Sequence, residues 1–447
     1  MKRSQGSPAV GAILTDASEI RFDDLTLDRY AVEGVRPSAV VWPRSEEELG
    51  RWLREVHRHR AKVLTWGAGE LMHLGGAPEG HDLAICTTRL NKVLDFDPEN
   101  LTISVQAGTT LAQLQKLALT SNLRLPLDPP VSSKATLGGI VAANAFGPLR
   151  HLYGGVRDFL LGCAAVLADG TFVKFGGKTV KNVAGYDLSK LFIGSCGTLG
   201  VLTRLTFRLL PVAETCRTVL AAFSSREACC AAAAEMAASA LGAAAVEVIS
   251  PAALGRIALP GSPVQADAYV LAVRFEGKRQ VVAAVTASAE RALRAKAEEV
   301  RRLNAAPGRQ FWGKLGEVLN GRAGNLQIRV NAPMAEVAQA LARIEQMVQE
   351  HDCTPELVSH FGLGVIILNV EVGQPDSEVA LARGVTTLRR QLAPQGGSVV
   401  LSRANPWSKA KVEVWGALPD TLNMVRRIKN QFDPQGVFAG GRFVGGL

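Results

Sequence analysis

The sequence predicts an α+β protein of two domains, and three observations support this prediction. The chain has 447 residues, and 47% of them are hydrophobic, which is enough to fill more than one core. Strand-like and helix-like patterns alternate up to Pro211, where we expect a boundary. Beyond it, strand and helix patterns repeat in two similar cycles, which favours a ferredoxin-like α+β domain with helices on an antiparallel sheet.

The first elements follow from local patterns in the part of the chain after an N-terminal extension, residues 1–34. Residues 39–42 predict a short strand, and SEEELGRWLREVHRHR predicts a helix capped by Ser45. AKVLTWGAGE predicts a strand that ends in a glycine turn. ICTTRLNKVLDFDPENLTISVQAG predicts two strands around DPEN, and TLAQLQKLALT predicts a helix. PLDPP is expected to be an extended loop, because proline removes backbone donors and restricts its neighbours.

A glycine-rich stretch from Ala135 to Pro211 completes the first domain, residues 35–212. It predicts a helix in ATLGGIVAANA, a hairpin around Asp169 and Gly170, and a closing strand in GTLGVLTRLTFRLLP. In the second domain, residues 213–447, RQVVAAVTASAERALRAKAEEVRRL predicts one long helix over 279–303. So many glycines in the first domain suggest a backbone that approaches a large, extended ligand.

Composition indicates which classes of partner and which cellular compartment we expect. The net charge is +9 and the pI is about 9.3, but no sustained Lys/Arg tract is present, so we expect no nucleic-acid partner. The seven cysteines include no paired CxxC spacing, unlike a disulfide framework or an iron–sulfur ligand set. We therefore expect a reducing cytoplasm. Because the N-terminal apolar patch is too short for a secretory core, any contact with the inner membrane is expected through partners.

One motif, WGAGE at 66–70, has two interpretations when it is taken alone. It follows a predicted strand, so its glycines can expose a nest of backbone N–H groups to a pyrophosphate. Taken alone, the motif favours the second interpretation, an ordinary glycine turn, because glycines are common in turns. The motif does not match GxGxxG, which disfavours a Rossmann site.

Taken together, WGAGE, the strand and AG turn at 105–108, PLDPP, TLGG and GTLGVLT resemble the FAD-binding domain of the vanillyl-alcohol oxidase, or PCMH-type, flavoprotein superfamily. KTVKNVAGYDLSKLFIGSCGTLGVLTRLTFRLLP is similar to the FAD-binding subunits of glycolate oxidase. The resemblance covers residues 35–212 strongly and the remainder loosely. It implies FAD held between two α+β subdomains, followed by an FAD-linked oxidase C-terminal domain.

The resemblance also implies which residues contact FAD. A first loop lies at the pyrophosphate, a second runs under it toward the flavin, a third segment crosses the flavin side, and the backbone of a strand covers the adenine. In that order these are Trp66, Gly67, Ala68, Gly69 and Glu70; Thr136, Leu137, Gly138 and Gly139; Asn144, Gly147, Tyr153, Gly154 and Arg157; and Gly197, Thr198, Leu199, Gly200, Val201 and Leu202.

Only a few residues bear on whether FAD is bound covalently and on the role of nearby charges. Some members of the superfamily attach the flavin through a histidine in the first loop region, but His73 and His81 lie outside WGAGE, so we expect noncovalent FAD. Lys178 and Lys181 are interpreted either as charge partners of the cofactor or as solvated lysines. Arg157 with Asp158 is alternatively a simple surface pair.

The C-terminal domain departs from the family pattern where substrate is positioned. HFGLGVIIL at 360–368 resembles HxGDGNxH, with Leu363, Val365 and Ile367 replacing polar residues. His360 alone cannot make a metal site, so we predict no metal and assign no catalytic residue. FDPQGVFAGGRF at 432–443 resembles a terminal segment that folds back near the flavin, which leaves Arg442 as a candidate anion contact.

The resemblance therefore implies an FAD-dependent oxidoreductase that serves as the FAD-binding subunit of a glycolate oxidase, or 2-hydroxy-acid dehydrogenase, complex. Its implied partners are a catalytic FAD subunit, an iron–sulfur subunit that passes electrons toward a quinone, and a small 2-hydroxy acid. Two alternatives remain open: a self-sufficient FAD oxidoreductase of another hydroxy acid or alcohol, and a noncatalytic scaffold subunit.

Overall fold

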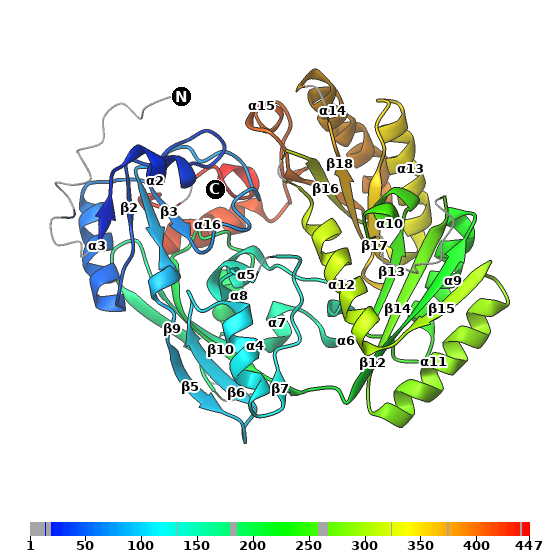
Figure 1. Ribbon diagram of the computed structural model, residues 1–447. Helices are drawn as coiled ribbons and strands as arrows, with labels where there is room; N and C mark the ends of the chain where they lie inside the picture. The colour runs from blue at the N-terminus through cyan, green and yellow to red at the C-terminus, as the bar shows by residue number, and fades with distance from the viewer. Residues whose placement is uncertain are drawn as a thin grey trace.

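The computed structural model describes residues 14, 19–131, 133–178, 186–257, 267–322, 324–372, 375–438 and 440–447. These residues form two units side by side (Figure 1). In chain order, the strands of the C-terminal unit run from β12 (Thr215–Phe223) to β19 (Ser398–Arg403). The described part of the chain contains no helix that is both long and apolar enough to cross a membrane. All seven cysteines are free thiols.

The first sheet of the N-terminal unit combines parallel strands with a covering helix. Its order is β1, β2, β4, β3, and β4 is parallel to both β2 and β3. The predicted helix forms, and the hydroxyl of Ser45 accepts a hydrogen bond from the amide of Glu48 at 3.2 Å. Its buried face includes Trp52 and Leu53, because apolar residues recur at helical spacing. The elements are β1 (Ile20–Arg21), α2 (Asp24–Arg29), β2 (Ala39–Val41), α3 (Glu46–Arg58), β3 (Val63–Trp66) and β4 (Leu83–Cys86).

The second sheet of this unit is antiparallel, in the order β5, β6, β10, β8, β9. The predicted hairpin around Gly170, whose φ is +80°, joins β8 to β9. Thr110 and Gln113 form a capping box at the start of α4, as the TLAQ pattern indicates. The elements are β5 (Val93–Asp97), β6 (Thr102–Gln106), α4 (Leu111–Leu119), β7 (Leu123–Arg124), α5 (Leu137–Ala143), α6 (Arg150–Tyr153), α7 (Val156–Phe159), β8 (Leu160–Val166), β9 (Phe172–Gly176), α8 (Ser189–Phe192), β10 (Val201–Arg208) and β11 (Leu210–Pro211).

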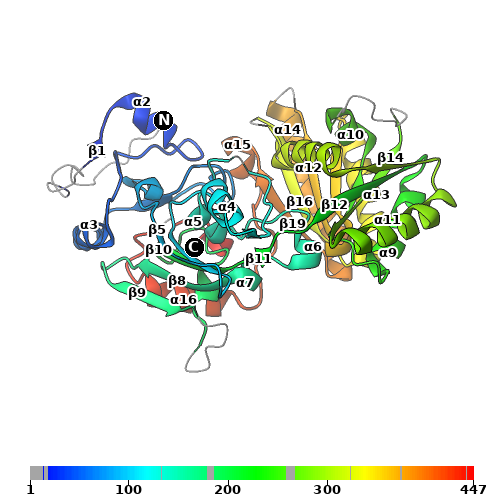
Figure 2. The same ribbon diagram turned by 60° about the horizontal axis from the view of Figure 1, so that its bottom comes forward.

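The C-terminal unit is built on one eight-stranded antiparallel sheet, in the order β15, β12, β14, β13, β17, β18, β16, β19. One face is covered by α9, α11, α13 and α14, and part of the other face by α10 and α12. The remaining area of that second face borders the N-terminal unit (Figure 2). The elements are α9 (Arg226–Ala238), β13 (Ala245–Ile249), α10 (Pro251–Ile257), β14 (Tyr269–Gly277), α11 (Arg279–Arg294), β15 (Glu299–Leu303), α12 (Ala305–Asn320), β16 (Leu326–Asn331), α13 (Val337–Gln349), β17 (Glu356–His360), β18 (Val365–Val370) and α14 (Pro375–Leu392).

The single long helix expected over residues 279–303 is wrong. The helix ends at Arg294, and Glu299–Leu303 form an edge strand that pairs with β12. Charged residues such as Arg301 and Arg302 fit an exposed helix and an exposed sheet edge equally well, so periodicity did not separate the two. Pairing with β12, which lies much earlier in the chain, decided the outcome.

The last segment of the chain returns to the N-terminal unit. In α16 (Leu422–Phe432) the ring of Phe432 packs against Phe192 and Phe175, with ring centroids 5.7 and 6.5 Å apart. Phe438 forms a bridge with Val63 of the first sheet. Figure 1 shows this red helix among the blue and cyan elements. The C-terminus is therefore brought close to the glycine-bearing loops.

Candidate functional site

A pocket opens in the N-terminal unit, and its empty space, including the open solvent at its mouth, is about 870 Å³. Three segments line it: residues 65–72, residues 135–143 and residues 195–202. Leu74, Thr87 and Arg442 complete the lining. The structure thus brings together three stretches that are far apart in the sequence.

The first loop follows β3 and is shaped by two glycines. Gly69 has a φ of +86°, which a residue with a side chain rarely adopts, and a Cβ there would lie 2.8 Å from Nε1 of Trp66. A Cβ on Gly67 would lie 2.2 Å from Oγ1 of Thr136. The glycines let the first loop lie directly on the second, so backbone forms much of the wall of the pocket.

The second and third segments repeat this construction. Thr136 caps α5, its hydroxyl accepting from the amide of Gly139 at 3.3 Å, and the amide of Gly138 donates to the carbonyl of Ala107 at 2.7 Å. Gly197 has a φ of +74°, and a Cβ there would lie 2.1 Å from Oγ1 of Thr65. Walls of unshielded backbone between apolar side chains match what a pyrophosphate and two ring systems require. The pocket therefore fits FAD.

The structure places twelve of the predicted contact residues on the lining of this pocket and the others elsewhere. Those on the lining are Trp66, Gly67, Ala68, Gly69, Glu70, Thr136, Gly138, Gly139, Gly197, Gly200, Val201 and Leu202. Leu137 and Leu199 belong to the adjacent hydrophobic core, and the hydroxyl of Thr198 donates to the carbonyl of Ser195 at 2.7 Å. Asn144 ends α5 in the left-handed conformation.

The remaining predicted residues lie between this pocket and the C-terminal unit or on the surface. Gly147 packs against Asp128, where a Cβ would lie 2.0 Å from the backbone oxygen. The hydroxyl of Tyr153 accepts from Arg124 at 2.9 Å, and Gly154 packs on the carboxyl of Asp158. Arg157 is exposed, and Asp158 instead accepts from the amide of Gly155 at 2.7 Å. Sequence similarity alone did not show this separation.

The two lysines and the terminal segment are also now placed. Lys178 forms an ion pair at 2.7 Å with Asp95 of β5. Lys181, Gly185 and Ala439 lie outside the described residues. Arg442 does line the pocket, but its guanidinium donates to the carbonyls of Gly76 at 2.6 Å and Met72 at 2.7 Å, and to that of Leu74. It holds a loop in place.

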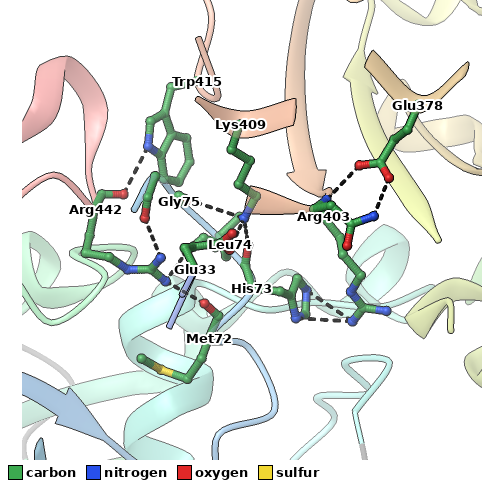
Figure 3. A network of polar contacts seen from close by, with 12 residues as sticks. Glu33, Met72, His73, Leu74, Gly75, Glu378, Arg403, Lys409, Trp415 and Arg442 are labelled. Atoms are coloured by element: carbon green, nitrogen blue, oxygen red, sulfur yellow. Dashed lines mark hydrogen bonds and ion pairs between the residues drawn. The ribbon is translucent and has the colours of Figure 1, made fainter. Parts of the chain in front are cut away.

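This loop, residues 72–76, is held by three cations from the C-terminal part of the chain (Figure 3). Besides Arg442, Lys409 of α15 (Pro406–Lys409) donates to the carbonyls of His73 and Gly75 and pairs with Glu33 at 2.5 Å. Arg403 contacts Nδ1 of His73 at 3.1 Å. Burial, together with Arg403, Lys409 and Arg442, lowers the pKa of His73 to about 3, so its ring is neutral. The loop borders the pocket through Met72 and Leu74.

A buried ionic group lies on the sheet face that borders the N-terminal unit. Glu247 of β13 and His360 of β17 are paired in register, and Oε2 and Nδ1 are 2.7 Å apart. Their relative exposures are 1% and 3%. Burial alone would lower the pKa of His360, but Glu247 and, less strongly, Asp128 raise it. Burial raises the pKa of Glu247 and that of Asp128, the latter to about 7.

Sequence reasoning missed Glu247, Asp128, Lys409 and Arg403, and it gave Arg442 a different role. A carboxylate inside the apolar strand AVEVI was the one available signal, because charged residues are seldom fully buried unless they are paired. Its partner, His360, lies 113 residues away, and nothing in the sequence linked the two. Among the described residues no group of three or more His, Cys, Asp or Glu side chains could hold a metal ion.

Comparisons with known proteins agree with this architecture. The FAD binding domain family matches residues 37–176, and the C-terminal domain of FAD linked oxidases matches residues 212–443. The fold is also that of p-cresol methylhydroxylase with substrate bound, with a TM-score of 0.74 at 16% identity over 97% of this chain and 95% of that one.

Curated relatives are similar over part of their length. Glycolate oxidase subunit GlcD of Bacillus subtilis is 38% identical over 193 residues, covering 43% of this chain and 41% of the relative. D-lactate dehydrogenase of Anaerostipes hadrus is 34% identical over 46% and 44%, and glycolate oxidase subunit GlcE of Escherichia coli is 37% identical over 34% and 43%. The match thus spans less than half the length of these relatives. The C-terminal family model alone covers more than half of the chain, so this protein belongs to the FAD-linked oxidases, with a PCMH-type FAD-binding domain and FAD as its cofactor.

Proposed function

We propose that this protein is an FAD-dependent oxidoreductase of small 2-hydroxy acids that works as the FAD-binding subunit of a glycolate oxidase-like complex. The glycine-shaped pocket, with three backbone segments around one cavity, is the observation that carries the proposal. The similarity to GlcD, GlcE and D-lactate dehydrogenase supports the substrate class. Bound FAD supplies an acceptor for two electrons and a proton.

The residues of this chain have separate roles in the proposal. The loops at 66–70, 136–139 and 197–202 bind the cofactor through backbone groups, and Arg442 positions the loop that borders them. The ring of His73 contacts Arg403, which supports noncovalent FAD. The Glu247 and His360 pair joins β13 to β17 on the sheet face that borders the N-terminal unit. Glycolate as substrate, an iron–sulfur subunit and a catalytic FAD subunit as partners, and a cytoplasmic location with membrane contact only through those partners complete the proposal.

The test is to purify the full chain from its native host and identify the chains that copurify. Under anaerobic conditions the flavin absorbance of the complex and of the separated chain is then followed after addition of glycolate or D-lactate. We expect FAD that trifluoroacetic or trichloroacetic acid releases from the protein, associated flavin and iron–sulfur subunits, and bleaching in the complex. Bleaching in the isolated chain at the same rate would instead show a self-sufficient oxidoreductase, and absence of flavin would show a scaffold.

A further inference from the structure

Lys409 of α15 is a buried cation that lies outside the lining of the FAD pocket. Its side chain is 1% exposed, and it pairs at 2.5 Å with Glu33, whose side chain is 7% exposed. The ammonium also donates to the carbonyl of His73 and, at 3.1 Å, to that of Gly75. A lysine ammonium has three N–H donors, and these three oxygen acceptors match them in number. Lys409 therefore acts through the groups that it holds, and not as a free nucleophile or base.

The short helix that carries Lys409 is fixed at its other end to the C-terminal unit. Its N-cap residue, Asn405, donates its backbone amide at 2.7 Å, and also its side-chain amide, to the carboxylate of Glu378 in α14. Glu378 is 2% exposed, and α14 packs into the core of the eight-stranded sheet. α15 thus connects the C-terminal unit to the loop at 72–76 (Figure 3).

Two cations hold every carbonyl group of this loop. Arg442 donates to the first, third and fifth carbonyl groups of residues 72–76, and Lys409 donates to the second and fourth. The loop also packs closely on the end of the chain, because a Cβ on Gly75, whose φ is +93°, would lie 2.3 Å from the carbonyl oxygen of Arg442. The orientation of the loop therefore depends on both cations, and only Lys409 reaches it from α15.

The direction of these carbonyl groups matters for an anionic cofactor. The loop borders the pocket through Met72 and Leu74. Backbone N–H groups attract a pyrophosphate, whereas the partial negative charge of a carbonyl oxygen repels it. The two groups of a trans peptide point in opposite directions, and no described peptide bond is cis. Cations that hold five consecutive carbonyl groups thus determine which groups the loop can present to FAD.

We infer that Lys409 is a positioning residue for FAD, and that it couples the occupancy of the FAD pocket to the packing of α15 on the C-terminal unit. This inference goes beyond the proposed function, because it needs FAD as the cofactor but no particular substrate. Coupling between two sites is reciprocal, so bound FAD should stabilise α15 by as much as Lys409 stabilises bound FAD.

The first experiment uses the unchanged full chain and measures amide hydrogen exchange by mass spectrometry with and without FAD. We expect FAD to slow exchange in residues 72–77 and also in residues 405–412, although α15 does not line the pocket. α11, which packs on β12, β14 and β15, is the internal reference and should exchange at the same rate in both states. Absence of slowing in residues 405–412 would overturn the inference, as would equal slowing in α11.

The second experiment removes the ammonium without leaving a buried carboxylate alone. Glu33→Gln/Lys409→Met removes both charges, and such a replacement of a buried ion pair is often neutral for stability. Because two hydrogen bonds from a charged group to the loop are lost, FAD should bind about 10- to 100-fold more weakly in fluorescence titrations of the apoprotein. FAD should then no longer slow exchange in residues 405–412 of this variant.

Lys411→Met is the matched control, because Lys411 is an exposed lysine of the same segment. It should bind FAD like the unchanged protein. Equal FAD affinity in Glu33→Gln/Lys409→Met and Lys411→Met would contradict the positioning role. Weaker FAD binding in the double variant with undiminished slowing in residues 405–412 would contradict the coupling and would leave the pair a general stabiliser of the fold. Neither experiment uses a hydroxy acid, so failure of this inference is distinct from failure of the proposed function.

Discussion

The two units of the protein use different materials. The pocket of the N-terminal unit presents backbone, shaped by Gly67, Gly69 and Gly197, whereas the sheet of the C-terminal unit carries buried charged side chains, Glu247 and His360. A backbone wall suits a cofactor that many related proteins share. Charged side chains on strands are exchanged without altering the fold, so they can distinguish one substrate from another. The N-terminal unit therefore holds FAD, and in the proposed function the C-terminal unit contributes to the choice of substrate.

Two buried histidines show the same contrast. His81 in the N-terminal unit is 1% exposed, and neither ring nitrogen has a hydrogen-bond partner in the described structure. Burial, with a smaller contribution from Arg442, lowers its pKa to about 4. His360 has Glu247 as a partner, and its pKa is raised. The pKa of a buried histidine is therefore lowered in the N-terminal unit and raised in the C-terminal unit.

The largest effect is expected from breaking the buried pair. His360→Ala leaves Glu247 buried without its partner, which should lower the free energy of unfolding by roughly 3–5 kcal/mol in urea titrations. Replacing both residues by leucine should recover most of the loss, because no charge then remains buried. A cost below about 1 kcal/mol for the single variant would show that the stability of the C-terminal sheet does not depend on this ion pair.

A second prediction concerns the stability of the protein in acid, which depends on His81, the buried histidine described above. The unfolded chain binds a proton at His81 below pH 6.5, but the folded chain does so only near pH 4. Stability should therefore fall as the pH drops through this window, by on the order of 3 kcal/mol. His81→Phe should remove that part of the pH dependence, while His59→Gln, at an exposed position, should leave it.

The sign is reversed for the pair in the C-terminal unit. The raised pKa of His360 gives a contribution that is complete below pH 6.5 and is lost as the pH rises through the folded value. The raised values of Glu247 and Asp128 act in the same direction. Unfolding curves of the two histidine variants should thus diverge at opposite ends of the pH range, and parallel curves would contradict the comparison.

The smallest effect is expected from adding one methyl group to the backbone that lines the pocket. Gly197→Ala places a side chain at a φ of +74° and 2.1 Å from Oγ1 of Thr65. The left-handed conformation alone costs about 1–2 kcal/mol, so FAD should bind roughly 10-fold more weakly or worse, as measured by flavin fluorescence. At Gly177 an added Cβ meets nothing within 4 Å, and Gly177→Ala should bind FAD normally.

Much of the fold was predictable because it rests on local signals. Ser45 capped its helix where expected, TLAQLQKLALT formed the predicted helix, and the Asp169 and Gly170 turn formed its hairpin. The strand at 299–303 was not predictable, because its exposed charges also suit a helix and only pairing with β12 selects the strand. The helix over 305–320 was missed for a related reason, since its start follows an edge strand that the prediction had absorbed into a longer helix.

By itself the sequence determined the α+β class, the glycine loops and the FAD they imply, because backbone freedom and short-range periodicity are properties of neighbouring residues. Only the tertiary structure decided that Arg442 and Lys409 hold the loop at 72–76 and that Glu247 meets His360. These contacts join residues more than 100 positions apart. Their energies depend on burial and on which strands become neighbours, and neither is written in local sequence.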